Sequence, residues 1–185
     1  MAFTAQDVKN LREKTGVGMM ECKKALTEAD GDMDRAFEIL RERGLAASEK
    51  KASRIAAEGA IIAYTDEATK TTVLLEINSE TDFVGKNDKF QAFGLNVAKT
   101  IAANKPASVE ELAGLALVDS DRTVQEALND LILVIGENLK IRRYEIVEGD
   151  VVTYIHGGVF AMNPGQKYLS DEEYAKMIED IKAAL

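Results

Sequence analysis

The chain has 185 residues, of which 46% are hydrophobic and 30% charged, and its formal net charge is −9. This is ordinary for a globular protein with one full domain and a smaller one. No apolar run approaches the roughly 20 residues of a membrane span, and the N-terminus lacks the basic and apolar regions of a secretory signal. A single cysteine, Cys22, excludes an internal disulfide framework and fits a reducing compartment.

The acidic side chains in excess over the basic ones all lie after residue 60. An acidic chain without a basic stripe is a poor candidate for binding the phosphates of nucleic acid. The composition therefore favours a protein or a small molecule as partner.

Residues 1–45 are predicted to form a module of three short helices. Thr4 is a suitable N-cap for the first helix, and Gly16 ends it. The second helix runs from about residue 18 to 29, and the third is expected to end at Gly44. Their apolar faces would form a small core of Val8, Leu11, Cys22, Ala25, Leu26, Ala29, Met33, Ala36, Phe37 and Leu40.

Residues 46–57 are rich in alanine and lysine, which predicts a solvated connecting helix. Residues 58–156 then have the pattern of an α+β core with an antiparallel sheet packed on helices. Four strands are predicted, over residues 59–65, 71–77, 139–147 and 151–155, the first two joined as a hairpin.

Three helices are predicted within this core. One begins near Asn87, and two others open with the capping boxes of Ser108 and Thr123. Gly136 lies at the end of the last of them. The following segment, 157–185, is expected to be irregular through Gly165 and then to form an amphipathic helix.

The loop over residues 78–84 carries the most informative pair of side chains, Asp82 and Phe83. It joins a predicted strand to a predicted helix, and binding residues concentrate on loops held by a rigid scaffold. An aromatic ring beside a carboxylate suits a wedge pushed into another protein. On the local pattern alone, however, Phe83 is more readily explained as a plug in the protein's own core.

Two other positions also have two interpretations. His156, at a predicted strand end, is more often a surface residue than part of a site, although histidine titrates near neutrality. Met19 and Met20 cannot both face one core, because neighbours on a helix point about 100° apart. One of them should therefore be exposed, where methionine often marks an adaptable contact surface.

The inventory of catalytic groups is thin. The sequence has no nucleophile elbow, no metal-binding constellation and no phosphate-binding loop. We therefore expect no metal and no cofactor. The pattern favours a binding protein over an enzyme.

Four separated segments carry distinctive motifs. They are residues 8–26, with Thr15-Gly16 and Met19-Met20; 78–84, with Thr81-Asp82-Phe83; 135–143; and 154–157, with Tyr154-x-His156-Gly157. Together, in this order, these segments resemble the elongation factor Ts family of bacteria. The resemblance implies a ubiquitin-associated-like three-helix module followed by an antiparallel core. It also implies a cytoplasmic guanine-nucleotide exchange factor for elongation factor Tu, which is not an enzyme in the covalent sense.

The resemblance further implies which residues contact elongation factor Tu. The wedge near the Mg²⁺ and nucleotide site would be Asp82 and Phe83. The other expected contacts are Thr81, Val84 and His156 in the core, and Arg12, Met19, Met20 and, as a weaker candidate, Lys23 in the module.

The chain departs from the family after residue 157, where members usually continue into a second core half. Residues 160–170 resemble a segment deeper in that half, and little else of it is expected here. The missing surface could come from a second copy, so a homodimer is possible. Two alternatives stay open: an adaptor that no longer exchanges nucleotide, and a small-molecule enzyme around His156, for which the sequence offers no partner residues.

Overall fold

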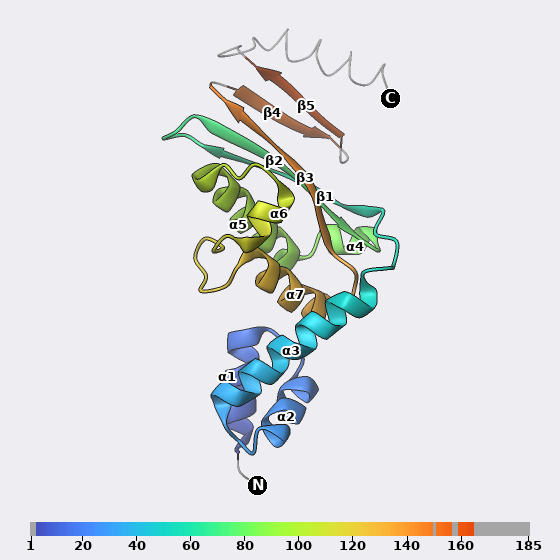
Figure 1. Ribbon diagram of the computed structural model, residues 1–185. Coiled ribbons are helices and arrows are strands. Elements are labelled where there is room, and N and C mark those ends of the chain that lie inside the picture. Colours follow the sequence, from blue (N-terminus) through green and yellow to red (C-terminus); the bar gives the residue numbers. More distant parts are fainter. Residues whose placement is uncertain (1–2, 150, 157–158, 165–185) are drawn as a thin grey trace.

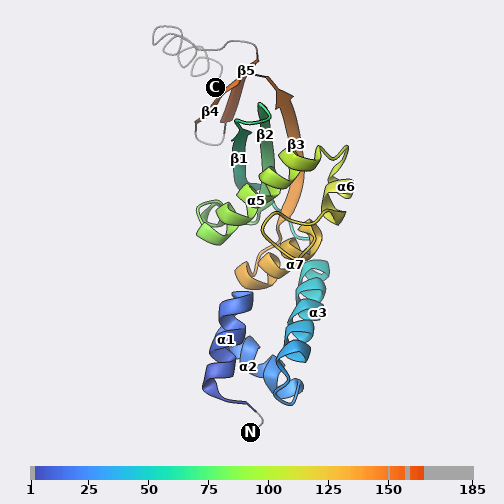
Figure 2. The same ribbon diagram turned by 90° about the vertical axis from the view of Figure 1, so that its left-hand side faces the viewer.

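The computed structural model describes residues 3–149, 151–156 and 159–164. Three helices, α1 (Ala5–Thr15), α2 (Met19–Glu28) and α3 (Met33–Lys51), form the N-terminal module. Figures 1 and 2 show this module at one end of the molecule and the last two described strands at the other. Its small core contains most of the predicted residues, with Leu11, Cys22 and Leu26 fully buried. Met33 and Phe37 are only partly buried, and Val17 and Ile39 join the core although they were not predicted.

Local signals define the ends of α1 as predicted. The Thr4 hydroxyl accepts the Asp7 N–H, and the Asp7 carboxylate accepts the Thr4 N–H in return, which completes a capping box. Gly16 ends the helix with φ of 69°, a left-handed conformation that glycine adopts without steric cost.

The prediction that Gly44 ends the third helix is wrong, because α3 continues to Lys51. Gly44 instead permits a close approach between helices: a Cβ at this position would lie 3.3 Å from the Asn129 carbonyl oxygen of α7 (Val124–Ile135). Residues 46–51 therefore continue α3, and the expected connecting helix does not extend through 52–57.

The core domain confirms the predicted α+β class. Its antiparallel sheet has the order β1-β2-β3, with β1 at Glu58–Asp66, β2 at Thr71–Ser79 and β3 at Lys140–Glu148. The helices α5 (Asp88–Asn104), α6 (Val109–Gly114) and α7 lie on one side of this sheet, as Figure 2 shows for α5 over β1 and β2. Between the two layers lies a continuous apolar core that includes Val73, Leu75, Phe90, Val97 and Ile132.

The predicted helix starts are also present. Asn87 caps α5 by accepting the N–H groups of Lys89 and Phe90, and Thr123 forms a complete capping box at α7. The box predicted at Ser108 is only half formed, because the Glu111 carboxylate accepts the Ala107 N–H, at 2.7 Å, instead of the Ser108 N–H.

The predicted fourth strand is confirmed as β4 (Val151–His156), but its partner strand was not predicted. It pairs with β5 (Val159–Pro164), a strand in a region expected to be irregular. Among the described residues these two strands form a separate two-stranded sheet. Two strand-like runs separated by a pair of glycines are a hairpin pattern, which the presence of Pro164 obscured. The helix expected over 170–184 lies outside the described residues.

Candidate functional site

The loop after β2 contains a one-turn helix, α4 (Asp82–Gly85). Phe83 is 80% exposed, which overturns the core-plug interpretation, whereas Val84 is only 7% exposed and belongs to the core cluster. Successive residues on a helix point about 100° apart, so burying Val84 turns Phe83 towards solvent. Asp82 and Thr81 are exposed as well. Val84 therefore anchors the turn and does not present its side chain at the surface.

Two glycines seat α4 closely against the start of β1. A Cβ at Gly85 would lie 2.7 Å from the Gly59 carbonyl oxygen, and Gly59 itself has φ of 135°, which strongly favours glycine. Gln91 lies on α5, and its side-chain amide donates to the Gly85 carbonyl. The backbone beneath Phe83 is thus held from β1 and from α5.

A carboxylate from a distant segment holds the other end of the turn. Glu137 follows α7, and its Oε2 accepts the N–H groups of Glu80 at 3.1 Å and of Thr81 at 3.0 Å. Its Oε1 accepts the Thr81 hydroxyl at 2.7 Å. The Thr81 side chain, expected to contact a partner, is therefore engaged within the chain.

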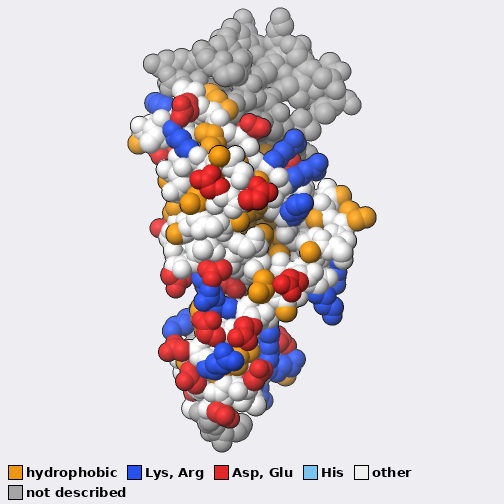
Figure 3. All heavy atoms as spheres, in the orientation of Figure 1, with side chains coloured by type: hydrophobic (Ala, Val, Ile, Leu, Met, Phe, Trp, Pro, Cys, Tyr) orange, Lys and Arg blue, Asp and Glu red, His pale blue; other side chains and the backbone are white. Residues whose placement is uncertain are grey.

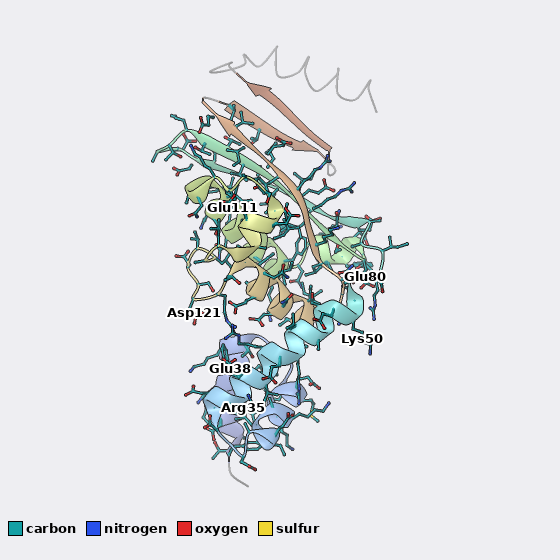
Figure 4. The ribbon with its side chains drawn as sticks, in the orientation of Figure 1. Arg35, Glu38, Lys50, Glu80, Glu111 and Asp121 are labelled. Carbon is teal, nitrogen blue, oxygen red and sulfur yellow. The ribbon has the colours of Figure 1, made fainter. Side chains whose placement is uncertain are left out.

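Glu80, on the loop that Glu137 holds, in turn accepts a hydrogen bond from the segment that follows Glu137. Its Oε1 accepts the Asn138 N–H at 2.6 Å and lies 3.4 Å from the Arg54 guanidinium. The Asn138 side-chain amide in turn donates to the Arg54 carbonyl at 2.8 Å. Figure 4 shows Glu80 beside the C-terminal end of α3, where Lys50 lies. We refer to Glu80 and Glu137 together as the acidic clamp.

Sequence reasoning did not predict the acidic clamp. Residues 135–143 were singled out only as a segment resembling the family, with no role for Glu137 or Asn138. The available signal was position: Glu137 is the first residue after Gly136, which ends α7 in a left-handed conformation with φ of 87°. A side chain at such a helix end can reach a neighbouring loop, but the sequence does not say which loop.

In the module, the expected contact residues are all exposed. Arg12 and Lys23 lie at the surface, and Met19 and Met20 are 44% and 65% exposed. The expectation that one of these methionines should be exposed is therefore confirmed, and the other is exposed as well. Met19 is the first residue of α2, and the buried stripe of that helix begins one turn later, at Cys22.

The module residues and the turn share one surface hollow. It has a volume of about 470 Å³ and is lined by Arg12, Gly16 and Gly18 from the module and by Phe83 and Glu137 from the core, among others. The Lys89 ammonium of α5 donates to the Gly16 carbonyl at 3.0 Å, directly joining the two parts. Arg12 and Phe83, which are far apart in the sequence, therefore border the same hollow.

The structure brings together the turn and Arg12, but it does not place every expected contact. His156 ends β4 opposite Val159, and its side chain lies outside the described part of the structure. The expected C-terminal amphipathic helix, and with it any surface supplied by a second copy, also lies outside it. Both stay predictions.

The described residues offer little for covalent chemistry. Among them, no group of three or more His, Cys, Asp or Glu side chains could hold a metal ion. Cys22 is fully buried, and this burial raises the pKa of its thiol, which disfavours the reactive thiolate. Within the same residues, no helix has the length and apolarity to cross a membrane. Figure 3 shows acidic and basic side chains interspersed on the visible face of the module, without a basic stripe.

Comparison with known proteins identifies the family. Residues 80–179 match the family described as "Elongation factor TS". Proteins named elongation factor Ts include one from Clostridium perfringens, 53% identical over 159 residues that cover 84% of this chain and 52% of that protein. One from Clostridium novyi is 54% identical over 158 residues, covering 83% and 52%.

A longer match is to the elongation factor Ts of Trichlorobacter lovleyi, 46% identical over 191 residues that cover 98% of this chain and 61% of that protein. The chain thus spans about half the length of the first of these relatives. Because the family match extends over more than half of the chain, the chain belongs to the elongation factor Ts family.

Proposed function

We propose that this chain is a guanine-nucleotide exchange factor that promotes GDP release from elongation factor Tu. The observation that carries the proposal is Phe83, a large aromatic side chain that is 80% exposed on a turn fixed from both ends. An exposed aromatic on a rigid mount suits insertion into a partner, because burying the ring is favourable and little ordering is needed. The names of the relatives support the same function.

In the proposed mechanism, Asp82 and Phe83 enter the GTPase beside its Mg²⁺ and nucleotide. GTPases hold GDP largely through Mg²⁺ and the phosphate-binding loop, so displacing these elements weakens GDP binding. Linkage requires the converse as well: GDP weakens the binding of the factor by the same ratio. The factor accelerates exchange without making or breaking a covalent bond, and it needs no cofactor of its own.

The N-terminal module would provide the docking surface. Arg12, Met19, Met20 and Lys23 are exposed, and methionine side chains adapt well to a partner surface. Since Arg12 and Phe83 border one hollow, a single partner surface could contact both. We propose His156 as a further core contact, and a cytoplasmic location for the protein. The ubiquitin-associated-like character of the module belongs to the same proposal.

The test is release of fluorescent GDP from elongation factor Tu with the double variant Asp82→Ala and Phe83→Ala. We expect slower stimulated release with an unchanged thermal midpoint, because both side chains are exposed. Leu45→Ala is a matched control, since Leu45 is 51% exposed but lies on α3. If the double variant stimulates release as well as the original chain does, the wedge mechanism is wrong.

A second candidate is a protein-binding adaptor that has lost exchange activity. The observation that favours it is the module surface, where the exposed Arg12, Met19, Met20 and Lys23 could bind a partner without any exchange of nucleotide. The same assay separates the two functions. An adaptor would bind elongation factor Tu without accelerating GDP release.

A further inference from the structure

We propose that Glu137 is a positioning residue that fixes the direction in which Phe83 projects. The proposal rests on the proposed exchange function. It concerns the loop beneath the wedge, which Glu137 holds through three hydrogen bonds, from the N–H groups of Glu80 and Thr81 and from the Thr81 hydroxyl.

The helix that carries Phe83 cannot fix its own direction. It has four residues. So short a helix is marginal in water, because one turn of hydrogen bonds does not compensate for the conformational entropy lost in nucleation. Within the described residues, the side chain of its N-cap, Thr81, makes no capping bond to α4. The Thr81 hydroxyl donates to the Glu137 carboxylate instead.

Glu137 itself stands on a rigid base. It lies between α7, whose Leu131 and Ile132 are buried, and β3, which begins at Lys140. The neighbouring Asn138 N–H donates to Glu80, so the two segments are joined by hydrogen bonds running in both directions. This arrangement transmits the position of the folded core to the loop that precedes Asp82.

Loss of these hydrogen bonds should change the direction in which Phe83 projects more than it lowers the free energy of unfolding. Thr81 is exposed, so water can replace the carboxylate at its N–H and hydroxyl groups. What water cannot replace is the connection to α7. Small displacements of a positioned group reduce rates strongly, so we expect Glu137→Ala to slow stimulated GDP release at saturating factor by about tenfold.

Two further variants test whether the hydrogen bonds carry the effect. Glu137→Gln keeps an oxygen for the two N–H groups and an amide that can donate to the Thr81 oxygen, so it should restore most of the release rate. Thr81→Val removes the hydroxyl with little change of shape, and it should slow release on its own. Combined with Glu137→Ala, it should add little, because both changes break one connection.

The measurement is the maximum rate of fluorescent-GDP release, its half-saturating factor concentration and the thermal midpoint of each variant. A positioning role lowers the maximum rate and leaves the midpoint close to that of the original chain. Glu145→Ala is the matched control, since Glu145 is an exposed acid on β3. This variant should stimulate GDP release at the rate of the original chain.

The opposing results are distinct. Glu137 also lines the hollow, so a direct contact with the partner would make the Glu137→Ala and Thr81→Val effects additive, which would overturn the positioning role. A Glu137→Ala variant that stimulates GDP release as fast as the original chain would also overturn the positioning role. If the Asp82→Ala and Phe83→Ala double variant slows release in the same assay, the proposed function stands in either case. If that variant stimulates release as well as the original chain does, the wedge mechanism fails, and if the original chain itself does not stimulate release, the proposed function fails.

Discussion

Replacing Phe83 or Phe90 with alanine removes the same side chain from two opposite environments. Phe83 is 80% exposed and Phe90 is 0% exposed. Fully burying a phenylalanine side chain stabilises a protein by about 1.5–3 kcal/mol, so the buried fifth of Phe83 corresponds to about 0.3–0.6 kcal/mol. Phe90→Ala should instead cost about 3–5 kcal/mol, because it also leaves a cavity beneath the sheet.

Urea unfolding followed by circular dichroism measures both free energies of unfolding. The two variants should differ by several kcal/mol although the deleted atoms are identical. A loss of about 2 kcal/mol or more for Phe83→Ala would refute the reasoning, because it would mean that the ring is packed inside the chain. In the proposed function, Phe83→Ala should nevertheless slow GDP release, so the same substitution separates stability from activity.

Two more predictions follow from the contacts. Gly85→Ala places a methyl group 2.7 Å from the Gly59 carbonyl oxygen, which is backbone and cannot rotate away, so α4 must shift. We expect a loss of about 1–3 kcal/mol in unfolding free energy, and a fully stable variant would contradict the close approach. At α7, hydrogen bonding from the Thr123 N–H, with help from Arg41, lowers the pKa of Glu126. The stabilisation that the ionised Glu126 carboxylate gives the folded chain is present above the unfolded pKa of about 4.3, and it is lost as the pH falls through the lower folded pKa. The stability difference between the original chain and Glu126→Gln should therefore shrink below about pH 4, whereas a constant difference from pH 7 to pH 3 would contradict this.

Features of the fold that depend on neighbours in sequence were predictable. Thr4 and Gly16 bound α1 through contacts within three or four residues, and Asn87 caps α5 in the same way. Gly44 was misread because its role is set by Asn129, which is 85 residues away. A glycine in a helical pattern has the same local signal whether it ends a helix or admits a neighbouring one.

In the candidate site, too, the features set by neighbouring residues were predictable and those set by distant residues were not. The sequence identified Asp82 and Phe83 as a notable pair, but it favoured a buried ring until the family resemblance was considered. Exposure of Phe83 depends on the seating of α4 between β1 and the acidic clamp, which joins residues 56 to 58 positions apart. No local pattern contains that information, because each carboxylate serves the backbone of the other segment.

The continuity of α3 through Gly44 restricts how the length of this chain can vary. Each residue inserted into an α-helix advances the following segment by about 1.5 Å and rotates it by about 100°. Since α3 begins in the module and packs on α7 in the core, one inserted residue would turn Arg12 away from the hollow that it shares with Phe83. Natural insertions should therefore gather in the turn between β1 and β2, where added residues leave the relative orientation of the two contact regions intact.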